Sequence, residues 1–295
     1  MSFDRSTPTG LTVAVLGVTC WAAGNVMVVT APMDGLQIAF WRILLGAIVY
    51  TAAVYISGRR ITSAMLRAVA PAGVVIAIEI AVFFVAIRET EVANATVISN
   101  LTPIVLLAAA ARAFNEKVTR LLVGVTVVSM AGVALVVFGS TQHSTWSPLG
   151  DSLSFVAMLF FAGYFALAKR GRETVSILEF QACLWIVGAV TLLPVSVVDA
   201  GGIDLPSSTQ WIWLFALLAV PGTGHLLVNW SHNHVRLVIT AMLTLSIPVM
   251  STIGAVLALD QTINVIQVSG MVITLAALSL VIRREVEIHA AGEAA

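Results

Sequence analysis

Charged side chains are scarce in this sequence of 295 residues, because Asp, Glu, Lys and Arg together make up only 10% of it. A soluble domain typically carries about 25%. The 15 basic residues balance the 15 acidic ones, so no positive charge excess suggests a nucleic-acid partner. Hydrophobic residues make up 59% of the chain, and its mean hydropathy is +1.00. We therefore expect a chain surrounded mostly by membrane lipid.

Motifs for metal, redox and nucleotide chemistry are also missing. Cys20 and Cys183 each lie in an apolar stretch, and neither belongs to a C-x-x-C or another metal-ligand spacing. The sequence contains no G-x-x-x-x-G-K-[ST] phosphate-binding loop, so ATP-driven work by this chain is not expected. We expect no metal, no other cofactor and no catalytic residues.

Long apolar runs dominate what is present. A helix needs about 20 such residues to cross the hydrocarbon core of a membrane. The sequence predicts an all-α integral membrane protein with ten spans, at about 10–31, 36–57, 66–88, 93–115, 118–139, 148–169, 177–199, 211–235, 238–260 and 262–283. Most Lys and Arg residues near the predicted loops fall on one side, including Arg59, Lys117 and Lys169. Since basic residues favour the cytoplasmic side, both termini are expected there.

Two similar phrases, "SNLTPIVLLAAAARAFNEKVT" and "LSIPVMSTIGAVLALDQTI", indicate an internal repeat, with Pro103 and Pro248 at matching places. Each half holds five predicted spans, and an odd number inverts the second half in the membrane. Inverted repeats are typical of secondary transporters, which bind substrate near the midplane between the repeats. We expect a first repeat over 1–139, an inverted second repeat over 148–284, and a cytoplasmic tail over 285–295.

The two prolines should disturb the spans that contain them. A proline lacks the N–H that would bond a carbonyl one turn earlier, and neighbouring hydroxyls can satisfy that carbonyl instead. For Pro103 the carbonyl lies near Ser99, with Thr102 close by, and Thr244 stands close to Pro248. We expect a kink at each site, which could serve as a hinge for gating or could simply fit the packing.

Two ionisable residues lie near the centres of their spans. A charge at the centre of a spanning helix costs about 2.5–3.5 kcal/mol, so Glu79 in the third span indicates a function. It could bind a substrate amine or carry a coupling proton, or it could be a protonated structural carboxyl. His225 occupies the matching place in the second half and could hold a zwitterion together with Glu79, or simply bond a backbone carbonyl.

Aromatic and amide side chains form the rest of the candidate substrate-binding set. Trp21 and Asn25 are one turn apart and share a face of the first span, and Tyr164 lies at the corresponding place in the sixth. Mid-membrane aromatic rings can line a cavity, although Trp and Tyr often anchor a helix at the lipid interface instead. Phe83 and Asn100 complete the set.

Two further charged residues are expected to be structural. Arg42 lies about six residues into the second span, where it could extend toward the outer interface or pair with an outer acid. Glu116 follows the fourth span, where it would stabilise the turn into the fifth.

Four segments carry a resemblance to a known family: Trp21–Asn25, Phe40–Arg42, the block from Pro103 to Glu116, and the second copy from Pro248 to Gly270. Over residues 10 to 283 the chain resembles the EamA family of the drug/metabolite transporter superfamily. The second copy has Gln261 where the family has glutamate, which favours a turn role for Glu116. In size, span number and N-terminal motif the chain is similar to the YddG-type amino acid exporters. This resemblance implies export of amino acids, aromatic ones among them, from the cytoplasm across a bacterial inner membrane by alternating access through a central cavity.

Other functions stay open on the sequence alone. The same superfamily also exports other small metabolites and drugs. A membrane enzyme is a distant alternative, with His232-Asn233-His234 as its only candidate cluster, and a channel lacks a filter sequence. Transport could be coupled to protons through Glu79 or could be facilitated diffusion. The expected partners are a small-molecule substrate and membrane lipid, and ten spans can enclose a cavity within a single copy.

Overall fold

The computed structural model describes residues 6–89, 92–140, 147–199, 205–259 and 262–293, and in these ranges the chain is helical apart from short connections. Gln261, the departure from the family pattern, lies outside them. The helices of the first half are α1 Pro8–Thr30, α2 Gly35–Ile56, α3 Ser63–Glu89, α4 Val92–Ser99, α5 Thr102–Ala113 and α6 Arg120–Ser140. The second half contains α7 Pro148–Thr174, α8 Ile177–Asp199, α9 Ser208–Leu217, η1 Leu218–Gly222, α10 Thr223–Ser231, α11 Leu237–Leu243, η2 Thr244–Ser246, α12 Ile247–Leu259 and α13 Val265–Glu293.

Nine stretches of helix within the described ranges are long and apolar enough to cross a membrane. The expected fourth span, 93–115, is not one of these nine, because it consists of the shorter helices α4 and α5 with a two-residue turn at Asn100 and Leu101 between them. The ninth span is also divided, with the 3₁₀ turn η2 between α11 and α12.

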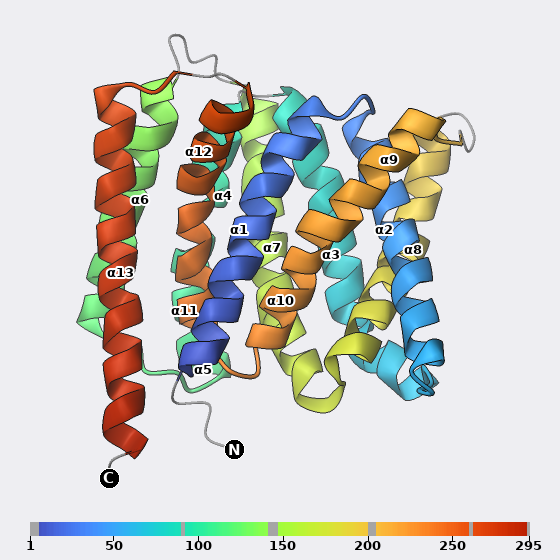
Figure 1. The fold of residues 1–295 in the computed structure, drawn as a ribbon, viewed down its shortest axis with the longest axis horizontal. Helices are drawn as coiled ribbons and strands as arrows, with labels where there is room; N and C mark the ends of the chain where they lie inside the picture. The colour runs from blue at the N-terminus through green and yellow to red at the C-terminus, as the bar shows by residue number, and fades with distance from the viewer. Residues whose placement is uncertain (1–5, 90–91, 141–146, 200–204, 260–261, 294–295) are drawn as a thin grey trace.

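The first helix of each half packs against helices of the other half. Helix α1 packs against α10 and α12, whereas α7, its counterpart in the second half, packs against α3, α4 and α5. Helices α2 and α8 pack together at one edge of the bundle, and α6 and α13 pack at the opposite edge (Figure 1). Each half therefore completes its packing through the other, and the central helices α1, α3, α7 and α10 meet between the two edge pairs.

The α6–α13 pair comes close enough for backbone contact at Gly132 and Gly270. A Cβ atom on Gly132 would lie 2.7 Å from the Gly270 carbonyl oxygen, and the Thr274 hydroxyl donates to the Ser129 carbonyl across the same interface at 3.3 Å. Small residues allow this approach, which is a common way for membrane helices to associate. Gly124, on the same helix, has no atom within 4 Å of such a Cβ.

The first residues of α1 and the last turns of α13 lie at the same end of the bundle, which we call the terminus end (Figure 1). The Thr7 amide donates to the His234 carbonyl at 2.9 Å, and Arg236 pairs with Glu285 at 2.9 Å. These contacts hold the beginning of α1 and the end of α13 against the connection between α10 and α11.

Candidate functional site

Glu79 lies on the inner face of α3 but keeps access to solvent. Val69, Ala72, Ile76 and Ala86 share this face at helical spacing, and each exposes 1% of its surface or less. Glu79 falls within that stripe and is only half-buried. Its accessible surface therefore faces the inside of the bundle rather than lipid.

Arg42 likewise lies on the inner face of its helix, α2. Its neighbours Ile38, Ala39 and Ile43 expose 1% or less, and Gly46, one turn further, is buried, yet Arg42 itself is half-buried. The charges of Arg42 and Glu79 interact, and Arg42 also acts electrostatically on His225. The structure thus brings Arg42 to the candidate site, whereas the sequence suggested only a structural role for it.

Aromatic rings surround His225 on α10. Its ring centroid lies 4.8 Å from that of Trp21, 5.1 Å from that of Trp185 and 6.4 Å from that of Tyr164. These rings come from α1, α8 and α7 respectively, so the cluster joins both halves. The predicted residues Trp21, Tyr164 and His225 therefore converge.

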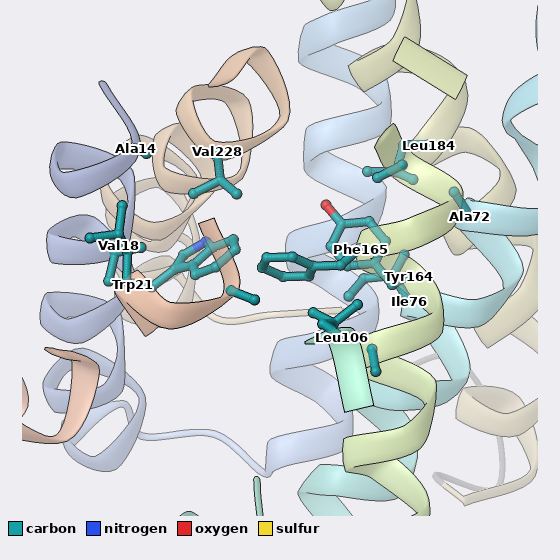
Figure 2. Close-up of a cluster of buried hydrophobic side chains, with 14 of the residues drawn as sticks. Ala14, Val18, Trp21, Ala72, Ile76, Leu106, Tyr164, Phe165, Leu184 and Val228 are labelled. Atoms are coloured by element: carbon teal, nitrogen blue, oxygen red, sulfur yellow. The ribbon is translucent and has the colours of Figure 1, made fainter. Parts of the chain in front are cut away.

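Trp21 also reaches the aromatic face of α7. Figure 2 shows its indole pointing toward Phe165, with the two ring centroids 6.2 Å apart. The ring centroid of Phe161 lies 6.0 Å from that of Trp21. Phe161 is half-buried, whereas Met158 and Phe165, one turn away on either side of it along α7, are buried. Accessible surface inside the bundle therefore includes an aromatic wall as well as the charges of Arg42 and Glu79.

A buried chain of polar side chains adjoins the aromatic cluster. The Tyr164 hydroxyl donates to Asn229 Oδ1 at 2.9 Å, and Asn229 Nδ2 donates to Gln181 Oε1 at 3.0 Å. All three residues are fully buried. These hydrogen bonds could not be predicted from the sequence, because Gln181 is 48 residues from Asn229 and has no motif around it.

Several buried nitrogens near His225 have no hydrogen-bond partner. They are Nε1 of Trp21, Nε1 of Trp185, Nε2 of Gln181 and Nδ1 of His225. Buried polar groups are nearly always paired, so each unpaired one calls for an explanation. The indole and amide nitrogens can only donate, and the cluster is therefore rich in donors.

The remaining predicted site residues lie at the margins. Asn25 is exposed and donates to the Ser251 hydroxyl at 3.3 Å, which ties α1 to α12. Phe83 is half-buried one turn beyond Glu79 on the inner face of α3, and Asn100 is half-buried at the break between α4 and α5. Trp230 on α10 stacks on His234, with the ring centroids 3.8 Å apart.

The helix is distorted at both prolines. Pro103 lies in the first turn of α5, and the Ser99 carbonyl accepts the Thr102 hydroxyl at 2.7 Å. Before Pro248, the Thr244 carbonyl accepts the backbone N–H of Ile247 in a 3₁₀ turn. Pro221 makes a third distortion, the π-helical turn η1 one turn before His225, which the sequence analysis missed. Such π turns frequently occur at functional sites.

A buried network of ionic and hydrogen-bond contacts lies at the terminus end of the bundle. The Glu116 carboxylate lies 2.8 Å from the Lys169 ammonium and accepts the backbone N–H groups of Leu237 at 2.6 Å and Val238 at 3.1 Å. Glu116 thus satisfies the first turn of α11, where a negative charge is favoured by the helix dipole. The sequence predicted a local turn role, whereas the structure shows that Glu116 joins the two halves.

The predicted alternative cluster at His232-Asn233-His234 does not converge. His232 packs on Phe165, with ring centroids 5.4 Å apart, whereas His234 stacks on Trp230. Burial, together with the charges of Lys169 and Arg172, lowers the pKa of His232 to about 3. Within the described ranges no group of three or more His, Cys, Asp and Glu side chains could hold a metal ion.

Comparison with known proteins matches this architecture. One solved structure, described only as "Crystal structure of protein", has 17% sequence identity and a TM-score of 0.77, and the alignment covers 95% of this chain and 100% of that one. At this identity the likeness shows the fold alone. No curated protein sequence matches significantly.

The sequence profile of the EamA-like transporter family matches residues 8–138 and again residues 148–283. The two matches span both halves of the helical bundle, and the members of this family are membrane transporters rather than enzymes. The chain therefore belongs to the EamA-like transporter family, as a multi-pass membrane protein with two EamA domains.

Proposed function

We propose that the chain exports amino acids, aromatic ones included, from the cytoplasm across the inner membrane of a bacterium. The observation that carries this proposal is the half-buried Glu79 on the inner face of α3, whose charge acts on Tyr164 in an aromatic cluster that both halves contribute. A carboxylate can bind an ammonium group, and rings can hold an apolar or aromatic side chain. Amino acids combine these two features.

The proposed topology has ten crossings, with the second domain inverted relative to the first and both termini in the cytoplasm. The first domain is 1–139, the second is 148–284, and 285–295 forms a cytoplasmic tail. The shared position of the first turn of α1 and the last turns of α13 supports this arrangement (Figure 1). The excess of Lys and Arg expected at cytoplasmic loops supports it too.

Export would proceed by alternating access. The ionic network around Glu116 and Lys169 lies at the proposed cytoplasmic side and joins the two halves, so we expect these contacts to separate when substrate enters. The breaks at Pro103 and Pro248 interrupt the two helices at equivalent places and are the proposed hinges. A single copy contains both halves of the site, because Trp21, Trp185 and His225 belong to one chain.

A counterflow experiment tests this function without assuming an energy source. Purified protein in liposomes is loaded with an unlabelled amino acid, and entry of the labelled amino acid is followed, with empty liposomes as the control. We expect saturable entry of phenylalanine and other apolar amino acids, weakened in Trp21→Ala. Folded protein that moves no amino acid would overturn the proposal and would direct the search to other metabolites or drugs.

A further inference from the structure

We propose that Arg42 and Glu79 are the two ends of a zwitterion site, in which Arg42 and the Trp185 indole N–H bind the substrate α-carboxylate and Glu79 binds its α-ammonium. This inference rests on the proposed function and deepens it, because it states which groups a substrate must carry. It also gives Arg42 and Trp185 direct roles in binding.

The charges of Arg42 and Glu79 act on each other without a direct contact. Both residues lie on the inner faces of their helices, and both are partly accessible to solvent inside the bundle. They interact electrostatically, but no hydrogen bond or ion pair within 4.0 Å joins these two described side chains. A substrate carrying one charge of each sign would give Arg42 and Glu79 each a direct partner.

The donors next to Arg42 suit a carboxylate. Trp185 packs over Gly46, one turn along α2 from Arg42, and a Cβ atom on Gly46 would lie 3.1 Å from Trp185 Cδ1. The adjacent Nε1 is buried without a partner. The ring of His225 lies 5.1 Å from that of Trp185, and its Nδ1 also has no partner. A carboxylate is a pure acceptor, so it matches the unpaired indole N–H of Trp185 and also the His225 ring in the tautomer that carries its proton on Nδ1.

Glu79 provides the opposite end of the site. Tyr164 is the other polar group on which its charge acts, and the Tyr164 hydroxyl already donates its proton to Asn229. The Glu79 carboxylate is therefore left to accept from a ligand. Trp21 and Phe161, with centroids 6.0 Å apart, lie in the same central region and would contact the substrate side chain.

The site should discriminate against molecules that carry only one of the two charges. A hydrogen bond to a charged group contributes about 10-fold to 100-fold in affinity, and an unpaired charge in the site opposes binding further. Phenethylamine, which lacks the carboxylate, and N-acetylphenylalanine, which lacks the ammonium, should each bind about 10-fold or more weakly than phenylalanine.

The test is competition by these two compounds against phenylalanine counterflow in liposomes. The variants are Arg42→Gln, Glu79→Gln and Trp185→Phe, the last of which removes the indole N–H but keeps a ring. Arg284→Gln and Glu287→Gln are matched controls, since both side chains are exposed, at 61% and 69%. Size-exclusion chromatography in detergent checks folding, and Arg42→Lys and Glu79→Asp replace any variant that fails it.

We expect Arg42→Gln to lose the preference for phenylalanine over phenethylamine and to keep the preference over N-acetylphenylalanine. Glu79→Gln should lose the preference over N-acetylphenylalanine and keep the preference over phenethylamine. Trp185→Phe should weaken the binding of phenylalanine several-fold and leave the binding of phenethylamine unchanged. If the wild type transports phenylalanine and both charge variants keep its preferences, the zwitterion site is wrong and the proposed function stands. If the wild type transports no amino acid, both fall.

Discussion

The carboxylate of Glu116, which follows the first half's α5, lies 2.8 Å from the ammonium of Lys169 on α7 of the second half, and each side chain exposes 1% of its surface. Lys169 also donates to the Val235 carbonyl at 3.2 Å, just before α11 begins. One buried ion pair thus links three segments that alternating access would have to separate.

Replacing Glu116 by alanine should destabilise the protein strongly. Lys169 would lose its 2.8 Å ion pair with Glu116, and the N–H groups of Leu237 and Val238 would lose their acceptor. Removing one partner of a buried ion pair costs about 3–5 kcal/mol. Thermal unfolding in detergent should therefore show a much lower midpoint for Glu116→Ala. Glu287→Ala, which removes an exposed ion pair with an N–O distance of 3.8 Å, should leave the midpoint unchanged. Equal midpoints for the two variants would contradict this prediction.

Acid should destabilise the folded protein through His232. In the unfolded chain its pKa is about 6.5, whereas burial and the charges of Lys169 and Arg172 lower the folded value to about 3. As the pH falls, His232 is protonated first in the unfolded state. Its protonation therefore does not reduce the free energy of unfolding above pH 6.5 and reduces it progressively between pH 6.5 and pH 3. The loss is about 1.4 kcal/mol per pH unit in that window, or about 2 kcal/mol at pH 5.

The measurement is the thermal midpoint at pH 7.5 and pH 5.0 for the wild type and for His232→Leu. We expect the wild type to lose more stability than the variant on acidification. The same loss in both proteins would show that other groups determine the pH response.

Two glycines of one helix should respond differently to the same substitution. Gly132→Ala would place its Cβ 2.7 Å from the Gly270 carbonyl oxygen, so α6 and α13 must move apart. Overpacking of this kind costs about 1–3 kcal/mol. Gly124→Ala meets nothing within 4 Å and should be neutral or stabilising by up to about 1 kcal/mol, because alanine is the better helix former. Thermal unfolding of the two variants checks the difference, and a destabilised Gly124→Ala with an unaffected Gly132→Ala would contradict the α6–α13 contact.

If the proline breaks are hinges, restoring a backbone N–H should slow transport more than it weakens binding. We expect Pro103→Ala and Pro248→Ala to reduce the maximal counterflow rate severalfold with little change in the half-saturating concentration. Pro71→Ala is the matched control, because Pro71 lies inside the continuous helix α3. Rates equal to that of the wild type in both variants would mean that the breaks only serve packing.

The repeat and its proline breaks could be predicted because they depend on residues close together in sequence. Ser99, Thr102 and Pro103 lie within one turn, so the freed carbonyl and its hydroxyl partner could both be named in advance. The sequence predicted a kink there, whereas the structure has a two-residue turn between α4 and α5, because a proline shows where a helix is disturbed but not by how much.

Relationships between distant segments could not be obtained in the same way. Glu116 and Lys169 are 53 positions apart, and no sequence motif links them; the same is true of Arg42 and Trp185. Trp21, Tyr164 and His225 were identified because polar or aromatic residues at mid-span are unusual. Their convergence depends on how α1, α7 and α10 cross, which only the packing of the two halves determines.

The central claim is that Glu79 and the rings near it form an amino acid transport site. The most direct test is phenylalanine counterflow measured side by side for wild type, Glu79→Gln and Glu287→Gln, with equal amounts of folded protein in the liposomes. We predict saturable counterflow in the wild type and in Glu287→Gln, and at least about 10-fold less in Glu79→Gln at low substrate concentration. Full counterflow in Glu79→Gln would contradict the claim.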